Sequence, residues 1–146
     1  MIRTIIIDDE PLAREIIKEY LQSYSNITVV EECNDGFEGV KAIMQHHPDL
    51  IFLDIQMPKI NGFEMLELVE QPPAVIFTTA FDEFAIKAFE NNAVDYLLKP
   101  FSQERFDKAI RKWLDTRDAG NEKSTQALLE QAGESPVQSQ RIVVKT

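Results

Sequence analysis

Polar residues that could carry out chemistry follow four of the chain's apolar runs. Asp8 and Asp9 follow the run 3–7, and Asp54 follows the run 50–53. Thr79 comes just after the run 74–77, and Lys99 follows the run 94–98. Converging carboxylates repel one another or bind a cation, and an all-oxygen site open to water and phosphate suits Mg²⁺. With a metal bound, Asp54 could attack phosphorus and form an aspartyl phosphate. Lys99 and the Thr79 hydroxyl could then bind phosphoryl oxygens.

The run before Asp54 indicates how these residues are positioned. Leu50–Leu53 shows no alternation of apolar and polar residues, which predicts a strand covered on both faces, as in a parallel sheet. In open α/β sheets, ligands bind at the carboxyl ends of the strands. Asp54 therefore stands where reactive groups are often placed, although an isolated Asp at this point also suits the cap of a following helix.

Strand and helix patterns alternate five times up to about Thr116. Strands are predicted over 3–7, 27–30, 50–53, 74–77 and 94–98, and a helix pattern follows each of them. This alternation implies right-handed crossovers and an α/β fold, a doubly wound five-stranded parallel sheet with helices on both faces. The ends of the first, third, fourth and fifth strands then lie along one edge of the sheet, so the polar residues that follow them become neighbours.

The helix patterns predict particular buried faces and caps. The apolar faces are Leu12, Ala13, Ile16, Ile17, Tyr20 and Leu21; then Phe37, Val40, Ile43 and Met44; then Phe63, Leu66 and Val69; then Phe84, Ala85, Ala88 and Phe89; and finally Phe106, Ile110, Trp113 and Leu114. Asp82 can cap the fourth helix and Ser102 the fifth.

Composition narrows the class of protein. The chain has 146 residues, enough for one domain and an appendage, and its formal net charge of -10 would repel phosphate backbones. We therefore do not expect this fragment itself to bind nucleic acid. Cys33 is the single cysteine, which excludes an internal disulfide and favours a buried apolar role. No stretch has the pattern of a signal peptide or a membrane span, which favours a cytoplasmic protein with no membrane partner.

The last part of the chain differs in composition from the rest. After about Thr116 the residues become polar and small, which predicts a first domain over 1–117 and a linker over 118–139. Gln126–Ala132 could form a short helix within that linker. Arg141–Thr146 has the pattern of a strand that ends without a partner. We therefore expect residues 140–146 to be the start of a second, truncated domain.

Each polar residue at the predicted edge also has a purely structural explanation. Asp8 and Asp9 could be an ordinary acidic pair at a helix N-terminus, Thr79 a turn hydroxyl, and Lys99 a solvated charge. Taken together, however, four strand ends that supply acid, acid, hydroxyl and amine favour a functional site.

Four motifs in this order resemble the receiver domain of two-component response regulators. They are Ile7-Asp-Asp-Glu10, Asp54-Ile-Gln-Met-Pro58 with Gly62, Thr78-Thr-Ala80, and Tyr96-Leu-Leu-Lys-Pro-Phe101. The resemblance covers residues 1–117. The stretches 77–89 and 92–100 look like the LytTR (LytR/AlgR) class, in which a receiver precedes a mostly β DNA-binding domain. Residues 141–146 are similar to the first strand of that domain.

The resemblance implies a flavodoxin-like (βα)5 fold with strand order 2-1-3-4-5. It implies that Asp54 accepts a phosphoryl group from a sensor histidine kinase, and that the domain catalyses its own phosphorylation and dephosphorylation without being an enzyme toward a separate substrate. Asp9, Asp54 and the Gln56 carbonyl would bind Mg²⁺ directly, and Asp8 would act through water. Thr79 and Lys99 would bind the phosphoryl group. The resemblance also implies a cis peptide bond between Lys99 and Pro100, and a switch role for Tyr96.

Phosphorylation would then repack the surface formed by the fourth helix, the fifth strand and the fifth helix. Phe84, Phe89 and Phe106 belong to these elements. Any of them that is exposed would mark a dimer surface, whereas a buried one belongs to the core. We expect phosphorylation to promote a homodimer, with DNA bound only through the missing C-terminal domain.

Two other classes of function stay open at this point. A Mg²⁺-dependent phosphatase with an aspartyl nucleophile would resemble haloacid dehalogenases. Those enzymes carry Asp-x-Asp at the first strand, whereas this chain has Asp8-Asp9-Glu10 there. A phosphate-independent interaction module is the other alternative. The chain has no Gly-rich loop after the first strand, which argues against a nucleotide-binding domain.

Overall fold

The computed structural model of the chain describes residues 1–131, with side chains through Asp118. The chain divides into two units, residues 1–109 and 110–146. The strands are β1 (Ile2–Ile7), β2 (Ile27–Cys33), β3 (Leu50–Asp54), β4 (Ala74–Thr79) and β5 (Asp95–Leu98). The helices are α1 (Pro11–Leu21), α2 (Gly36–His46), α3 (Gly62–Glu67), the 3₁₀ turn η1 (Asp82–Phe84), α4 (Ala85–Glu90) and α5 (Gln103–Gln131). Within the described part of the chain, no helix is long and apolar enough to cross a membrane.

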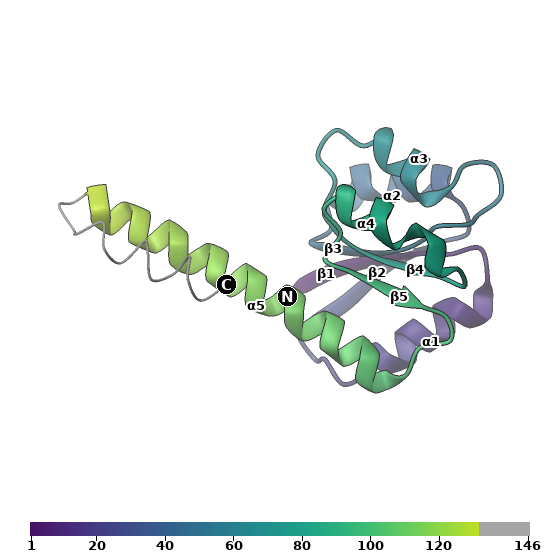
Figure 1. The fold of residues 1–146 in the computed structure, drawn as a ribbon, viewed down its shortest axis with the longest axis horizontal. Coiled ribbons are helices and arrows are strands. Elements are labelled where there is room, and N and C mark those ends of the chain that lie inside the picture. Colours follow the sequence, from purple (N-terminus) through teal and green to yellow (C-terminus); the bar gives the residue numbers. More distant parts are fainter. Residues whose placement is uncertain (132–146) are drawn as a thin grey trace. The chain divides into compact units, whose positions relative to one another are not determined.

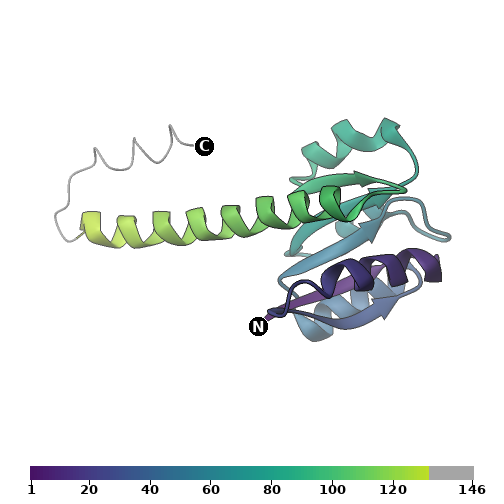
Figure 2. The ribbon, with the colours of Figure 1, turned by 90° about the horizontal axis from the view of Figure 1, so that it is seen from below.

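The five strands form one parallel sheet in the order β2-β1-β3-β4-β5, as predicted (Figure 1). Every residue of β3 is buried, which confirms the interpretation of its unalternated apolar run. Figures 1 and 2 show α2, α3 and α4 on one face of the sheet, and α1 with the start of α5 on the other. Because the strands are parallel, their carboxyl ends meet at one edge of the sheet.

Both faces of the sheet are packed with apolar side chains. The cluster under α2, α3 and α4 includes Ile5, Ile7, Ile51, Leu53, Phe63, Met65, Phe77 and Ala88. On the other face, Phe106 is fully buried and its ring centroid lies 5.4 Å from those of Phe52 and Tyr20. Cys33 is also buried, and burial raises the pKa of its thiol to about 12, as expected of an apolar residue rather than a reactive one.

The predicted apolar face of α2 is wrong for two of its four residues. Phe37 and Met44 are exposed. Small residues face the sheet in their place: a Cβ on Gly39 would lie 2.9 Å from both Ile7 Cδ1 and Met65 Sδ. The helix therefore approaches the core more closely than large side chains on this face would permit, and its bulky residues point into solvent.

The other helix predictions have mixed outcomes. Leu12 is exposed, whereas Ile17 and Leu21 form the buried face of α1. Asp82 begins η1 rather than capping α4, and neither element has a side-chain hydrogen bond at its N-cap. Ser102 caps α5 as predicted, since its Oγ accepts a hydrogen bond of 3.1 Å from the Arg105 amide.

The last helix runs past the predicted end of the first domain. The backbone of α5 continues to Gln131, so residues 118–131, predicted as linker, are helical. Residues 121–131 contain good helix formers such as Glu, Lys, Gln, Ala and Leu, and this propensity outweighs their polar composition. The strand predicted at 141–146 lies outside the described residues, and the division into first domain, linker and second domain stays a prediction.

Candidate functional site

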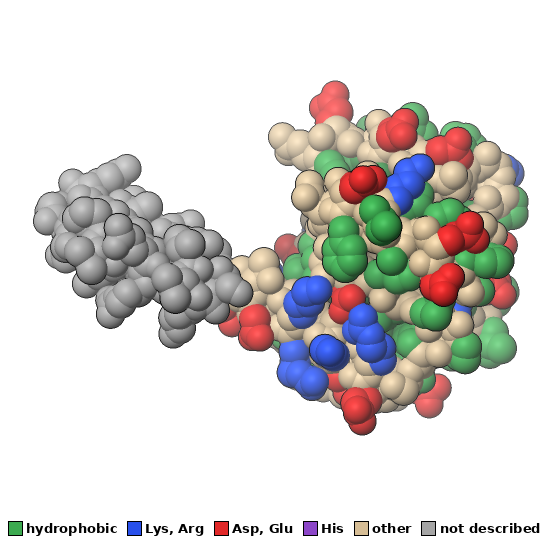
Figure 3. Space-filling model, in the orientation of Figure 1, with side chains coloured by type: hydrophobic (Ala, Val, Ile, Leu, Met, Phe, Trp, Pro, Cys, Tyr) green, Lys and Arg blue, Asp and Glu red, His purple; other side chains and the backbone are tan. Residues whose placement is uncertain are grey.

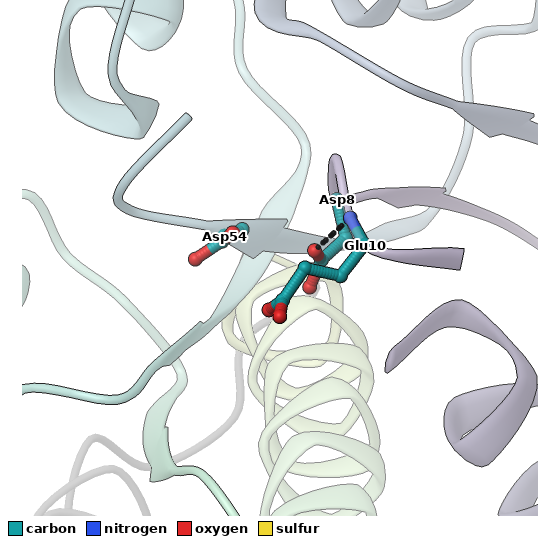
Figure 4. Close-up of side chains that lie close together, drawn as sticks. All are labelled: Asp8, Glu10 and Asp54. Carbon is teal, nitrogen blue, oxygen red and sulfur yellow. Dashed lines mark hydrogen bonds between the residues drawn. The ribbon is translucent and has the colours of Figure 1, made fainter. Parts of the chain in front are cut away.

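The carboxyl edge of the sheet brings together side chains from three strand ends. Asp8 follows β1, Asp54 ends β3 and Lys99 follows β5. The Lys99 Nζ lies 2.9 Å from Asp8 Oδ2 and 3.6 Å from Asp54 Oδ2. Carboxylate oxygens of Asp8, Glu10 and Asp54 lie within 4.8 Å of one another (Figure 4). A cluster of carboxylates with one amine therefore forms at the predicted edge of the sheet. Its third carboxylate, besides those of Asp8 and Asp54, belongs to Glu10.

Asp8 is held by several contacts of its turn. Its backbone amide donates to the Cys33 carbonyl at 3.0 Å, and its own carbonyl accepts from Arg14 Nη1 at 2.7 Å. Its Oδ1 accepts from the Glu10 amide at 2.9 Å. The buried Oδ2 has Lys99 within ion-pair distance, but it accepts no hydrogen bond of good geometry. The Asp8 Oδ2 atom can therefore still accept a hydrogen bond or bind a cation in the site.

Asp54 is buried at the end of the central strand. The Gln56 amide donates to its Oδ1 at 3.3 Å. Behind it, a Cβ on Gly62 would lie only 2.7 Å from the Asp54 carbonyl oxygen and 3.3 Å from Ile55 Cα. Only glycine fits this close approach, because the obstructing atoms belong to the backbone. The Gly62 amide in turn donates to the Ile55 carbonyl at 2.9 Å.

The surroundings of Asp54 disfavour its charged form. Burial, and then the charge of Asp8, raise the pKa of its carboxyl to about 7, which Lys99 opposes. Asp9 raises the pKa of Asp54 further, both by its charge and by a hydrogen bond between the two side chains. Asp9 is not among the three carboxylates of the compact group, and its role as a metal ligand stays a prediction.

Lys99 is the cation that partly balances these acids. Burial acts to lower the pKa of its ammonium, but the hydrogen bond to Glu10 and the close charge of Asp8 prevail and raise that pKa above its ordinary value. Its side chain is 16% exposed, so the ammonium is largely shielded from water. The peptide bond that joins it to Pro100 is cis, as the resemblance implies.

Gln56, Thr79 and Tyr96 are joined to the site or to its loops by hydrogen bonds. Gln56 has an exposed side chain, and its backbone amide reaches Asp54. Thr79 is fully buried, and its Oγ1 accepts from the Phe81 amide at 3.2 Å. The Lys99 amide donates to the Thr79 carbonyl at 2.7 Å, so these two residues are adjacent through their backbones. Tyr96 donates from its hydroxyl to the Phe81 carbonyl, above the loop that follows Thr79.

Two residues that sequence reasoning did not assign support the site. Glu10 contacts Lys99 at 2.9 Å, and its place in the Asp8-Asp9-Glu10 run was the available signal. Arg14 holds the Asp8 carbonyl and also contacts Glu32 Oε1 at 3.2 Å. Nothing in the pattern of the first helix distinguishes Arg14 from an ordinary polar residue.

The acidic pocket has the properties of a site for a hard divalent cation. Its donors are all oxygens, and the Asp8 Oδ2 atom is buried without a well-formed hydrogen bond. Burial and then the neighbouring carboxylates raise the pKa of Asp54, and a cation placed among these carboxylates would relieve their repulsion. A donor set made only of oxygens favours a hard cation such as Mg²⁺ over softer metals.

Comparison with known proteins assigns the family. Residues 4–111 match the model of the response regulator receiver domain. The transcriptional regulatory protein BtsR of Escherichia coli (strain K12) is 50% identical over 114 residues, which cover 77% of this chain and 48% of that protein. An uncharacterized response regulatory protein of Vibrio cholerae is 46% identical over 116 residues, 78% of this chain and 49% of that protein. The chain thus spans about half the length of these relatives.

Solved structures with the same fold agree. The response regulatory domain of protein mrkE from Klebsiella pneumoniae superposes with a TM-score of 0.72 at 30% identity, covering 79% of this chain and 97% of that one. The response regulator domain of Thermotoga maritima CheB superposes with a TM-score of 0.68 at 30% identity, covering 77% and 96%. The chain therefore belongs to the family of response regulator receiver domains.

Proposed function

We propose that Asp54 receives a phosphoryl group from a sensor histidine kinase, and that this event switches a C-terminal output domain. The observation that carries the proposal is the buried Asp54 carboxylate at the sheet edge, with Asp8 and Lys99 beside it. Similarity to a transcriptional regulatory protein about twice as long supports control of transcription through a DNA-binding domain. The motifs given above suggest the LytTR class for that domain.

The residues of the site divide the work of phosphoryl transfer. An Asp54 carboxylate oxygen forms a bond to phosphorus as the bond from phosphorus to the kinase imidazole nitrogen breaks, and that nitrogen keeps the electron pair. Lys99 and Thr79 bind phosphoryl oxygens. Asp9, Asp54 and the Gln56 carbonyl would hold Mg²⁺ directly, with Asp8 acting through water. When bound, the ion would neutralise charge on the phosphoryl oxygens.

The switch follows from the position of Thr79. Its hydroxyl is engaged by the Phe81 amide in the loop that Tyr96 covers. If Thr79 turns toward a phosphoryl oxygen, this loop must rearrange and Tyr96 loses its partner at the Phe81 carbonyl. The half-buried Tyr96 ring then moves inward, which changes the surface of α4 and β5.

Phosphorylation is tested by intact mass. After incubation with Mg²⁺ and acetyl phosphate, the wild-type chain is expected to gain one phosphoryl group and Asp54→Asn none. A gain in Asp54→Asn would place the phosphoacceptor elsewhere. No gain in either protein, together with no binding of beryllofluoride and Mg²⁺, would favour a phosphate-independent module. Sustained release of phosphate from a generic phosphate ester would favour a phosphatase.

The α4 and β5 surface is our candidate for dimerisation. Ile86 and Phe89 of α4 are 76% and 59% exposed, and Leu98 of β5 is also exposed. Figure 3 shows hydrophobic side chains gathered over these elements, with Lys and Arg side chains next to them. Of the three phenylalanines named from the sequence, Phe89 is exposed, Phe106 belongs to the core, and Phe84 is half-buried against Phe63, with ring centroids 6.2 Å apart.

We expect beryllofluoride with Mg²⁺ to shift the protein from monomer toward dimer in sedimentation velocity. Phe89→Glu is expected to prevent this shift, because a carboxylate would be buried in an apolar interface. Phe37→Glu is the matched control: Phe37 is an exposed residue of α2, and this variant should dimerise like wild type. Dimerisation that survives Phe89→Glu but not Phe37→Glu would place the interface on α2.

A further inference from the structure

The side chain of Glu10 does not cap the helix that it precedes. Glu10 is the N-cap residue of α1, with φ of -96° and ψ of 114°, but its side chain makes no cap hydrogen bond. Ser, Thr, Asp or Asn at this position ordinarily accepts from the first free amides of the helix, and the longer Glu10 side chain does not. In this chain, Glu10 Oε1 instead accepts from Lys99 Nζ at 2.9 Å (Figure 4 shows its carboxylate beside Asp8). The Glu10 carboxylate therefore contacts Lys99 and leaves the helix amides free of it.

Lys99 has three acidic neighbours at unequal distances. Asp8 and Glu10 each lie 2.9 Å from Nζ, whereas Asp54 lies at 3.6 Å. Asp8 is fixed by the contacts of its turn, but the Glu10 side chain is 63% exposed and can swing away. The ammonium thus lies closer to Asp8 and Glu10 than to Asp54, and of these two nearer carboxylates only Glu10 is exposed enough to move away.

We infer that Glu10 is a positioning residue that holds the Lys99 ammonium in the resting state and competes for it with a phosphoryl group on Asp54. The inference rests on the function proposed above. It has two consequences of opposite sign. The charge of Glu10 adds to the acidic pocket and strengthens its attraction for a divalent cation, whereas its contact with Lys99 weakens the binding of an acyl phosphate or its analogue.

Three variants of the full chain separate these effects. Glu10→Gln removes both the charge and most of the hold on Lys99. Glu10→Asp keeps the charge but shortens the side chain by one methylene, which loosens the contact. Glu15→Gln is the matched control, because Glu15 lies on α1, the helix that starts just after Glu10, is 65% exposed and pairs with Lys18 at 2.6 Å rather than with Lys99.

Mg²⁺ affinity is measured by titration calorimetry, and beryllofluoride affinity by amide NMR at saturating Mg²⁺. Glu10→Gln is expected to bind Mg²⁺ about two- to fivefold more weakly and beryllofluoride about two- to fivefold more tightly, the range typical of an exposed ion pair. Both changes should shrink in about 1 M salt, where the screening length falls to about 3 Å. Glu10→Asp should keep the Mg²⁺ affinity and still bind beryllofluoride more tightly.

Opposite changes in the two affinities support a positioning role, since simple loss of structure would weaken both. The inference is overturned if Glu10→Gln matches Glu15→Gln in both titrations, or if the two affinities change in the same direction. Wild-type protein that binds Mg²⁺ but no beryllofluoride would overturn the proposed function itself, and the inference with it. A wild type that binds both ligands keeps the function whatever Glu10 does.

Discussion

Asp54→Asn is expected to stabilise the metal-free protein at pH 8 by up to about 4 kcal/mol. The pKa of Asp54 is about 7 in the folded chain, against an ordinary value of 3.8. The folded state therefore binds a proton that the unfolded chain releases between about pH 4 and pH 7. The contribution of this group to the free energy of unfolding is fully present below about pH 4. Between about pH 4 and pH 7 it falls by about 1.4 kcal/mol for each pH unit, and above pH 7 it is lost. Asparagine never ionises, so the variant escapes this loss.

The measurement is urea unfolding of both proteins with a chelator at pH 5 and pH 8. The advantage of Asp54→Asn should be small at pH 5 and large at pH 8. An advantage that is equal at the two pH values would contradict the argument, because amide substitution would then act by something other than charge. Added Mg²⁺ supplies a second check: at about a hundredfold excess over its Kd it should stabilise wild type by about 2.7 kcal/mol, and Asp54→Asn by less.

Lys99→Met is expected to have the opposite effect and to destabilise the metal-free protein by about 3 to 5 kcal/mol at pH 8. Methionine keeps the apolar stem but leaves Asp8 and Asp54 buried without their cation, and breaking a buried ion pair from one side costs about this amount. Adding Asp54→Asn to Lys99→Met should recover part of the loss, because one of the uncompensated charges is then removed.

Lys59→Met provides the control for that prediction. Lys59 pairs with Asp35 at 3.3 Å, but its side chain is 63% exposed. Pairs of this kind contribute at most about 1 kcal/mol. Guanidinium or urea unfolding curves of both variants, collected at the same pH, give the comparison. A Lys99→Met protein no less stable than Lys59→Met would show that water already screens the carboxylates of the site.

The sheet and its reactive edge could be predicted because each depends on a strong local signal. The unalternated run before Asp54 favours a strand with both faces covered, and β3 is buried throughout. Asp8 and Lys99 could be placed together because parallel strands present the same end to one edge. Such reasoning uses only strand order and direction, which the alternation of elements determines.

Details that depend on side-chain size or on long contacts could not be predicted in this way. The apolar character of Phe37 and Met44 predicts that they are buried, whereas the close approach of Gly39 to Ile7 decides which face of α2 is buried. The contact between Glu10 and Lys99 joins residues 89 positions apart. No helical or strand period reports such a pair, so only the folded chain reveals it.

The close contact at Gly62 has a mechanical consequence. Because no side chain separates the start of α3 from the Asp54 carbonyl, two backbones bear directly on each other without a deformable layer between them. If phosphorylation of Asp54 displaces the end of β3, we expect α3 to move with it, since no side-chain rotamer lies between them to absorb the shift. Amide exchange in α3 should therefore change when beryllofluoride and Mg²⁺ are added, although α3 carries none of the predicted site residues.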